Sequence, residues 1–182
     1  MVCKRGKHPA NMMNLELNIE RIKQISKARK AENYEFRAFL KGLDSVKVDK
    51  IVHKLNNEIV SRIDCRECGN CCRLLRPYLT VTEIEVLSQI DNISKKEYIQ
   101  KYVKKDDIEE TKYLKVTPCR YLNDKSCTIY ESRPFDCESY PHTHKKDFTS
   151  RTWGMIANYE ICPIVFNLFE LLKQKLNFKA KS

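Results

Sequence analysis

The chain has 182 residues, of which 42% are hydrophobic and 32% charged, a composition typical of one soluble globular domain. No apolar run approaches the roughly 20 residues needed to cross a bilayer, so we expect no membrane span. With only 4 Gly and 6 Pro, collagen-like and Gly-linker architectures are excluded. The net charge is +10, and residues 1–62 hold 14 Lys and Arg against 7 Asp and Glu. This excess suits an acidic protein or a nucleic-acid partner on the N-terminal helices, although a solvated Lys-rich helix surface explains it more simply.

The first 13 residues are predicted to form a disordered tail. Met1, Met12 and Met13 are each candidate starts of the chain, and Cys3 in this tail is assigned no function. The tail is basic, but the apolar segment of a secretory signal does not follow it. We therefore expect a cytoplasmic protein, in which clustered thiols bind metals or act in redox chemistry more often than they form structural disulfides.

Residues 14–62 are predicted to form a basic helical region. Apolar residues recur at helical spacing over 14–40, and a cleaner stripe runs over 48–63. Residues 42–45 interrupt the pattern with Gly, Asp and Ser. We therefore expect a helical hairpin, or one bent helix, that acts as a scaffold for the rest of the chain.

Residues 63–182 are predicted to form a compact cysteine-rich, metal-binding domain. A strongly apolar helix over 164–178 ends it and is expected to dock on the other helices. Two further helices are expected at about 83–91 and 95–104. Each is preceded by the Ser/Thr-x-x-Glu pattern of a capping box, formed by Thr82 with Glu85 and by Ser94 with Glu97.

Two short segments of this domain have the composition of strands. They are residues 112–117 (KYLKVT) and 127–130 (CTIY), and they flank the turn residues Asn123 and Asp124. We expect them to pair as a small hairpin. The predicted fold class is therefore mainly α with a small β-hairpin.

Eight of the nine cysteines form two groups in this domain: Cys65, Cys68, Cys71 and Cys72, followed by Cys119, Cys127, Cys137 and Cys162. Two residues between cysteines allow a tight turn to point both sulfurs at one centre, and Gly69 permits the left-handed backbone that such a turn often needs. Because neighbouring side chains diverge, Cys71 and Cys72 are expected to serve different sites, or different metals of one cluster. Eight thiols are the number needed for two four-thiolate sites.

The bound metal is left open between two alternatives. The Cys-x2-Cys-x2-Cys run, with a Cys-Pro about ninety residues later, is similar to the bacterial ferredoxin pattern and favours a [4Fe–4S] cluster. Zinc is the rival, because a tetrahedral four-thiolate site needs only two such cysteine pairs. Four cysteines within eight residues make a role as small buried hydrophobic residues the weaker explanation.

Over about residues 60–165 the chain contains the motifs CRECGNCC, CRYL and CTIYESRPFDC, and in these it resembles the CxxCxxCC cysteine-cluster family. That family is described as chelating zinc or iron and is also called Fe–S-cluster-containing protein. The resemblance implies the eight cysteines as ligand positions, with Cys162 in the later Cys-Pro. Glu138 stands where relatives commonly carry Arg, so a role for positive charge there is not expected. Larger relatives include flagellin lysine methylases, but this chain shows no Gly-rich phosphate- or adenosyl-binding loop, and their activity is not carried over.

Three functions follow as hypotheses. The first is a cytosolic metal-binding protein whose iron–sulfur cluster or zinc is structural or carries electrons. The second is a metal-dependent modification or redox enzyme with an open cluster position, so enzymatic activity is left open. The third is a zinc-stapled nucleic-acid or ribosome-associated module, whose binding would weaken steeply with salt.

A few other residues in this region have two interpretations each. His142 and His144 follow Cys137 closely and could complete or tune a metal site, or simply be exposed. The guanidinium of Arg133 is expected to bond a carboxylate or a cluster sulfur, or to form a surface salt bridge. Trp153 and Tyr159 could cover the site, but burial in the core is the simpler expectation.

Overall fold

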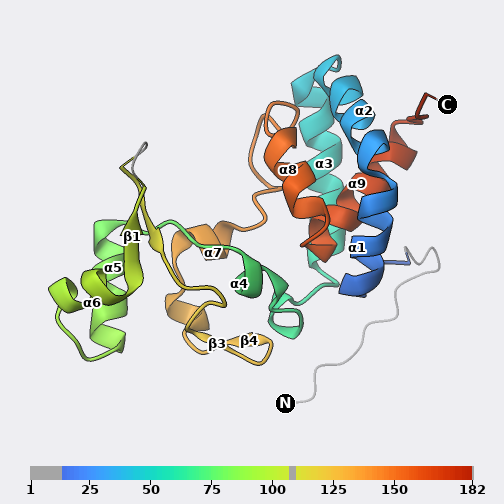
Figure 1. Cartoon of the computed structure of the whole chain (residues 1–182). Coiled ribbons are helices and arrows are strands. Elements are labelled where there is room, and N and C mark those ends of the chain that lie inside the picture. The colour runs from blue at the N-terminus through green and yellow to red at the C-terminus, as the bar shows by residue number, and fades with distance from the viewer. Residues whose placement is uncertain (1–13, 107–109, 182) are drawn as a thin grey trace.

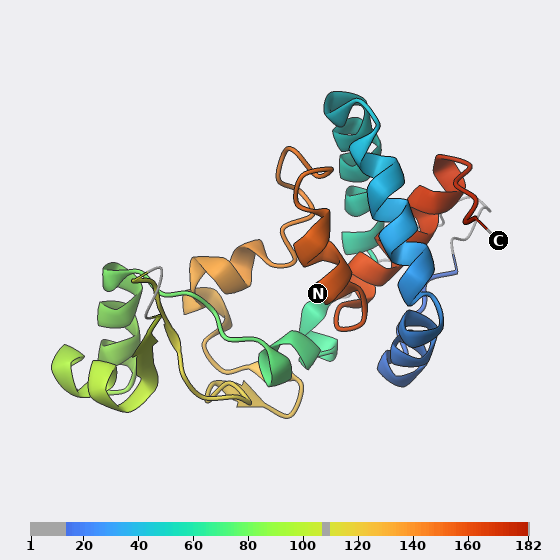
Figure 2. The ribbon, with the colours of Figure 1, turned by 45° about the horizontal axis from the view of Figure 1, so that its top comes forward.

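The computed structural model describes residues 14–106 and 110–181. Cys3, the candidate starts and the predicted tail of residues 1–13 lie outside the described residues. The molecule has three parts in a row, which Figures 1 and 2 show from two directions. A larger helical body lies at one end, a smaller lobe lies at the other, and short cysteine-bearing segments lie between them. The structure is mainly α-helical with small antiparallel strand pairs, which confirms the predicted fold class.

The helical body is built from helices at both ends of the sequence. They are α1 (Ile19–Ala28), α2 (Lys30–Lys41), α3 (Ser45–Val60), α8 (Thr152–Tyr159) and α9 (Pro163–Lys175). The side chains of Asn18 and Asp44 cap α1 and α3, because each accepts a hydrogen bond from a backbone N–H in the first helical turn. The helix predicted over 14–40 is two helices, since the backbone leaves the helical conformation at Arg29.

The core of this body joins the N-terminal helices to the end of the chain. α9 packs mainly against α3, and most of its apolar residues are buried together with those of α1, α2 and α3. The aromatic side chains of Phe36, Phe148, Tyr159 and Phe169 meet in the middle at ring-centroid distances of 5.6–6.1 Å. The predicted division of the chain near residue 62 stays a prediction, but the core of the helical body draws on both sides of it.

Asp49 links α3 to the loop before α8. Its carboxylate accepts hydrogen bonds from the backbone N–H of Asp147 at 2.8 Å and from that of Phe148 at 2.9 Å. Both Asp49 and Phe148 are buried. The loop is therefore held by an acceptor that lies about a hundred residues away in sequence.

Replacing Asp49 by Ala is expected to lower the free energy of unfolding by about 1–3 kcal/mol, because the buried N–H of Phe148 is left without a partner. Urea titration followed by circular dichroism measures the loss. Lys50→Ala is the matched control, since Lys50 is the exposed neighbour on the same helix and should change the stability by less than about 0.5 kcal/mol. Equal stability of the two variants would show that the loop is held by other contacts.

The smaller lobe consists of α5 (Val81–Ile90), α6 (Lys95–Tyr102), β1 (Val103–Lys105) and β2 (Lys112–Leu114). The capping box at the start of α5 is formed by Thr80 and Glu83. The prediction of Thr82 with Glu85 was therefore wrong, and the helix begins two residues earlier than expected. Ser94 caps α6 as predicted. The helix predicted to reach 104 ends at Tyr102, because Val103 begins a strand.

The predicted strand pairing was also wrong. Residues 112–114 pair with 103–105, and β3 (Leu122–Asn123) pairs with β4 (Ser126–Cys127) as a separate hairpin. The β3–β4 loop is only two residues long, and its first residue, Asp124, has a φ of +52°. Each segment thus pairs with a near neighbour in sequence, which closes a shorter loop at lower entropic cost than the expected pairing across residues 118–126.

The C-terminal helix occupies 163–175 rather than 164–178, and Pro163 lies in its first turn, where a missing N–H costs no hydrogen bond. Across the described residues, no single helix is both long and apolar enough to cross a membrane. The bent pair of α8 and α9, with 115° between them, meets the length and composition criteria only when taken together. Most residues of α9 are buried in the core of the helical body.

Candidate metal centre

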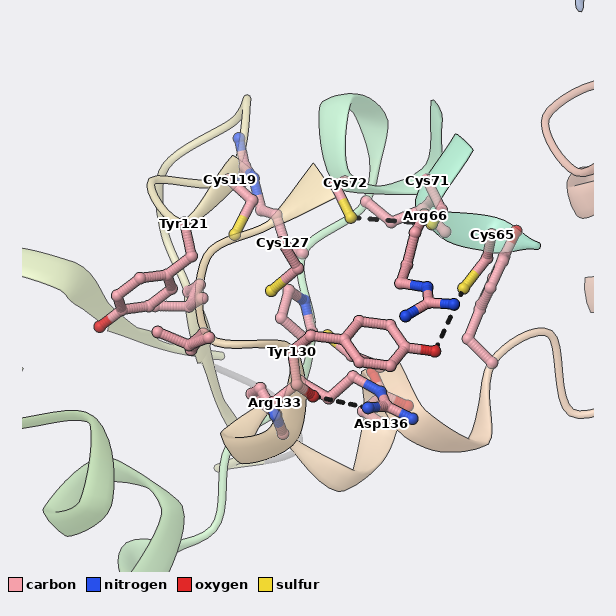
Figure 3. A pocket seen from close by; sticks show the side chains of 18 of the residues that line it. Cys65, Arg66, Cys71, Cys72, Cys119, Tyr121, Cys127, Tyr130, Arg133 and Asp136 are labelled. Carbon is pink, nitrogen blue, oxygen red and sulfur yellow. Dashed lines mark hydrogen bonds between the residues drawn. The ribbon is translucent and has the colours of Figure 1, made fainter. Parts of the chain in front are cut away.

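The eight predicted cysteines are all free thiols in the structure. Six of them line one mostly apolar cavity of about 110 Å³: Cys65, Cys71, Cys72, Cys119, Cys127 and Cys137. Figure 3 shows this cavity from close by, with the sulfurs of Cys72, Cys119 and Cys127 turned toward a common space. Cys68 and Cys162 do not line it. The structure therefore places most of the predicted ligands around one cavity, and the remaining two outside its lining.

The first cysteine group is shaped by two short helices, η1 (Cys65–Glu67) and α4 (Asn70–Leu74). The Asp64 side chain caps η1 by accepting a hydrogen bond from the N–H of Arg66 at 2.9 Å. The backbone N–H of Cys68 and that of Gly69 both donate to the carbonyl of Cys65 at 3.2 Å. The tight turn predicted from the spacing is present, but Cys65 lines the cavity and Cys68 does not.

Gly69 has a φ of +61°, which confirms the predicted left-handed turn. A Cβ atom there would lie 2.7 Å from the carbonyl oxygen of Lys125 in the β3–β4 loop. The turn between Cys68 and Cys71 can therefore approach the hairpin that carries Cys127 only because this residue has no side chain.

Gly69→Ala is expected to lower the free energy of unfolding by about 1–2 kcal/mol or more, because Ala disfavours this φ and its Cβ meets a backbone atom. Metal content per chain should fall with it, since the two cysteine segments are pushed apart. Gly154→Ala is the matched control: a Cβ at that position of α8 meets nothing within 4 Å. Thermal unfolding and metal analysis of both variants test this expectation, which fails if Gly69→Ala retains wild-type stability and metal content.

The second group approaches α4 through backbone contacts. The N–H of Cys119 donates to the carbonyl of Cys72 at 2.8 Å, and the N–H of Leu122 donates to the carbonyl of Cys119 at 3.0 Å. Leu122 in turn pairs with Cys127 in the β3–β4 hairpin. Cys137 lies in the short helix α7 (Phe135–Ser139), which begins immediately after Pro134. Residues 72, 119 and 127 are thus linked by hydrogen bonds over a span of more than fifty residues of sequence.

Burial and mutual charge act together on these thiols. Burial raises the pKa of Cys137, and the charges of Cys119 and Cys72 raise it further. Burial likewise raises the pKa of Cys119 and Cys127, and in each case the charge of Cys72 adds to the shift. Each thiolate therefore destabilises the next in the absence of a cation, which is the electrostatic condition that a bound metal relieves.

Cys71 and Cys72 differ although they are neighbours in α4. Their sulfurs lie 3.9 Å apart and share a hydrogen bond. This bond raises the pKa of Cys71 and lowers that of Cys72. The charges of Cys162 and Cys65 also raise the pKa of Cys71. The charge of Cys72 raises the pKa of Cys119, Cys127 and Cys137, and that of Cys65 also raises the pKa of Cys127.

Cys162 is the most buried of the eight and precedes α9 at its N-terminal end. Burial raises its pKa to about 11, although the backbone N–H groups of Val165 and Ile164 oppose the shift. The hydroxyl of Tyr140 is buried without a hydrogen bond of normal geometry, and Cys162 is the thiol that acts on it as a weak partner. The pKa of Tyr140 is raised by burial and then by the charges of nearby thiols, that of Cys162 first.

One thiol lies at the edge of the site. Cys65 is exposed, and its sulfur lies 3.8 Å from the hydroxyl of Tyr130. The guanidinium of Arg66 lies 5.3 Å from the centre of the Tyr130 ring and that of Arg133 lies 3.8 Å from it. Neither Tyr130 nor Arg66 was predicted as a site residue, because their only signal in the sequence is their position inside the two cysteine motifs.

The structure shows the surroundings of the two histidines and of Tyr159 and Trp153, for which the sequence left two interpretations each. The two ring nitrogens of His142 contact Ser139 Oγ at 2.7 Å and Asp136 Oδ1 at 3.3 Å, so this histidine supports the α7 segment. His144 is exposed. Tyr159 is buried as expected, but Trp153 is 63% exposed, so its predicted core position was wrong.

Arg133 lies close to the thiol cavity, which it lines. Its charge lowers the pKa of Cys127 against the effect of burial. One guanidinium nitrogen donates a hydrogen bond to the carbonyl of Tyr130 at 2.5 Å. Its partner is therefore a backbone carbonyl, and not the carboxylate, cluster sulfur or surface salt bridge that the sequence predicted.

The donor set fits a metal centre, although the thiols stand apart. Within residues 14–106 and 110–181, no three or more His, Cys, Asp or Glu side chains are close enough together to hold one metal ion as they stand. The short helices around the cavity, η1, α4, η2 (Tyr130–Ser132) and α7, bury only Asn70 and Ser139. The centre of the molecule therefore contains reduced thiols where a hydrophobic core would otherwise be needed, and coordination requires these side chains to close in on the metal.

A family model described as "Putative zinc- or iron-chelating domain" (CxxCxxCC) matches residues 64–162, more than half of the chain. The chain belongs to the CxxCxxCC family. The match begins at the residue that caps η1 and ends at Cys162, so it spans all eight cysteines of the site. Membership in the CxxCxxCC family indicates zinc or iron chelation without separating the two metals. Neither the search of curated proteins nor that of solved structures found a significant match.

Proposed function

We propose that the protein binds an iron–sulfur cluster of the [4Fe–4S] type through its cysteine thiolates, in the reducing environment of the cytoplasm, where the cluster is structural or carries electrons. The observation that carries this proposal is the convergence of six thiols on one mostly apolar cavity. A [4Fe–4S] cluster takes four thiolates, and the proposed ligand positions are the eight cysteines Cys65, Cys68, Cys71, Cys72, Cys119, Cys127, Cys137 and Cys162, enough for two such sites.

The cavity has room for a cluster. One water molecule needs about 10–15 Å³ of such space, and this cavity has about 110 Å³, so a group that brings its own inorganic sulfur fits between thiols that stand apart. A single zinc ion, with Zn–S bonds about 2.3 Å long, requires a larger closing movement of the same thiols.

The surrounding side chains suit an anionic cluster. Arg66, Arg133 and Lys125 are among the residues that line the cavity, and Asp136 supplies the one carboxylate in its lining. The positive charges of the two arginines and the lysine offset the negative charge that thiolates add in a mostly apolar space. When bound, a cluster of this type accepts and donates single electrons, and its potential depends on hydrogen bonds to the sulfurs and on exposure to solvent.

Anaerobic purification followed by absorption spectroscopy and metal analysis tests the proposal. We expect a broad band near about 400 nm, with iron and sulfide in equal amounts. If the protein is colourless and holds zinc, the proposed cluster is wrong and the thiols form four-thiolate zinc sites. A protein that holds neither metal after reconstitution with iron and sulfide, or with zinc, would overturn metal binding altogether.

The exposure of Cys65 favours a second candidate function, a modification or redox enzyme in which one metal position is open to substrate. Cys65 borders a second, more open cleft lined by Val60, Glu67 and Tyr130, so a small molecule can approach this ligand position from solvent. Cys65→Ser distinguishes the two functions. An enzyme with an open position at Cys65 retains its metal in this variant, whereas a closed site loses it.

A further inference from the structure

We infer that the thiols form two adjoining four-thiolate centres, which meet at the Cys71-Cys72 dipeptide. The first centre consists of Cys72, Cys119, Cys127 and Cys137. The second consists of Cys65, Cys68, Cys71 and Cys162, and the Tyr140 hydroxyl donates a hydrogen bond to one of its sulfurs. This inference rests on the proposed function, and it assigns each ligand to one centre.

The helical geometry of α4 separates the two members of the dipeptide. Successive residues of an α-helix point about 100° apart, because one turn takes about 3.6 residues. Cys71 and Cys72 are consecutive in α4 with sulfurs 3.9 Å apart. They can therefore stand side by side while each faces a different set of partners.

The first centre follows from the contacts of Cys72. Its carbonyl accepts the N–H of Cys119, whose own carbonyl accepts the N–H of Leu122, the strand partner of Cys127. In Figure 3 the sulfurs of Cys72, Cys119 and Cys127 face one space, and Cys65 lies on the other side of Arg66. Cys119 and Cys127 also pack against the hydrophobic core of the smaller lobe. This centre therefore connects α4 to that lobe.

The second centre follows from the contacts beside Cys71. The side-chain amide of Asn70 donates to the carbonyl of Ile161 at 2.8 Å, which fixes the start of α4 next to Cys162. Cys162 belongs to the hydrophobic core of the helical body, and Tyr140 packs against the same core. The Tyr140 hydroxyl is buried there without a hydrogen bond of normal geometry, so a thiolate of this group supplies the acceptor that it lacks. This centre connects α4 to the helical body.

The adjacent cysteines provide a matched pair of variants for the test. Zinc or iron is measured per chain in the wild type, in Cys71→Ser and in Cys72→Ser, each after anaerobic reconstitution. The wild type is expected to hold two centres and each single variant one. Cys71→Ser combined with Cys162→Ser should still hold one centre, because both changes fall in the same centre. Cys71→Ser combined with Cys137→Ser should hold none.

The outcomes separate this inference from the function on which it rests. If the wild type binds no metal, the proposed function is wrong and the grouping falls with it. If the wild type binds metal but every single variant loses all of it, the thiols form one polynuclear centre and only the grouping is overturned. Retention of one centre in Cys71→Ser with Cys137→Ser would overturn the assignment of these ligands.

Tyr140→Phe provides a second test that does not depend on losing a ligand. Loss of a hydrogen bond to a ligand typically weakens metal affinity by roughly 10–100-fold. Zinc affinity is measured by competition with a chelator. We expect it to fall by about this factor when Tyr140→Phe is added to Cys72→Ser, a variant in which only the second centre remains. The same change in Cys71→Ser should leave the affinity unchanged. Equal effects in both backgrounds, or no effect in either, would overturn the assignment of Tyr140.

Discussion

Stripping the metal with a strong chelator is expected to unfold the central part of the molecule and leave the helical body folded. The central elements η1, α4 and η2 are three to five residues long, and β3 and β4 have two residues each. Helices shorter than about 12–15 residues and isolated hairpins are marginal in water. The centre has little apolar burial of its own, so its order must come from metal–thiolate bonds.

The expected effect is large. Structural zinc contributes about 10–16 kcal/mol of apparent binding free energy in small metal-dependent domains, and this energy is folding free energy because the unfolded chain has no preformed site. Hydrogen exchange followed by mass spectrometry measures it by segment. After chelation, protection is expected to disappear over residues 64–79 and 117–140 and to persist in α3 and α9. Adding the metal back under reducing conditions should restore protection.

Two results of the hydrogen-exchange experiment would contradict this expectation. If residues 64–79 and 117–140 keep their protection in the chelated protein, hydrogen bonds alone hold the centre and the metal is not structural. If α3 and α9 lose protection together with the centre, the molecule folds as one cooperative unit.

Phe169→Ala is expected to cost about 3–5 kcal/mol, the range found for truncating a large buried aromatic residue. Phe169 is fully buried in α9. The centre of its ring lies 5.8 Å from that of Phe36 in α2, 5.6 Å from that of Tyr159 in α8 and 6.1 Å from that of Phe148 in the preceding loop. Truncation therefore opens a cavity where four segments of the helical body meet.

Denaturant unfolding of the metal-loaded protein measures this loss, with metal content per chain as the second readout. Val46→Ala is the control, because Val46 lies on α3 with 65% of its surface exposed and its truncation should change stability by less than about 0.5 kcal/mol. Below the unfolding midpoint, Phe169→Ala should keep its metal, since the ring lies outside the thiol cavity. A loss below about 1 kcal/mol would show that the aromatic cluster can repack.

The helices of this protein follow from local signals, and the places where prediction failed show the limits of such signals. The apolar stripe of α3 and the Pro at the start of α9 mark helices that the structure confirms. The sequence contains both Thr80 with Glu83 and Thr82 with Glu85, and each pair has the capping pattern. In the fold the first pair forms the cap, and Glu83 also accepts a hydrogen bond from the backbone N–H of Phe135 in α7, a tertiary contact that a local pattern does not record.

The prediction of the strand pairing was wrong for a related reason. Residues 112–117 and 127–130 both have strand composition, but composition does not name a partner. β2 pairs with β1, whose residues were predicted to end a helix. The partner is chosen by loop closure and by packing in the core of the smaller lobe, where Leu114 of β2 is buried with Ile84, Leu87 and Tyr98.

The chemistry of this protein can be recognised without coordinates. The left-handed turn at Gly69 is confirmed, because the φ preference of glycine is a property of a single residue. The eight cysteines are free thiols in the structure, and their role as metal ligands stays a prediction. The tertiary structure decides which thiols lie close together. Cys162 is far from Cys71 along the chain, but the hydrogen bond between Asn70 and Ile161 brings the two segments together. Tyr140 was not predicted as a site residue for the same reason: such contacts depend on how α4 packs between the two cores, and a local pattern does not record them.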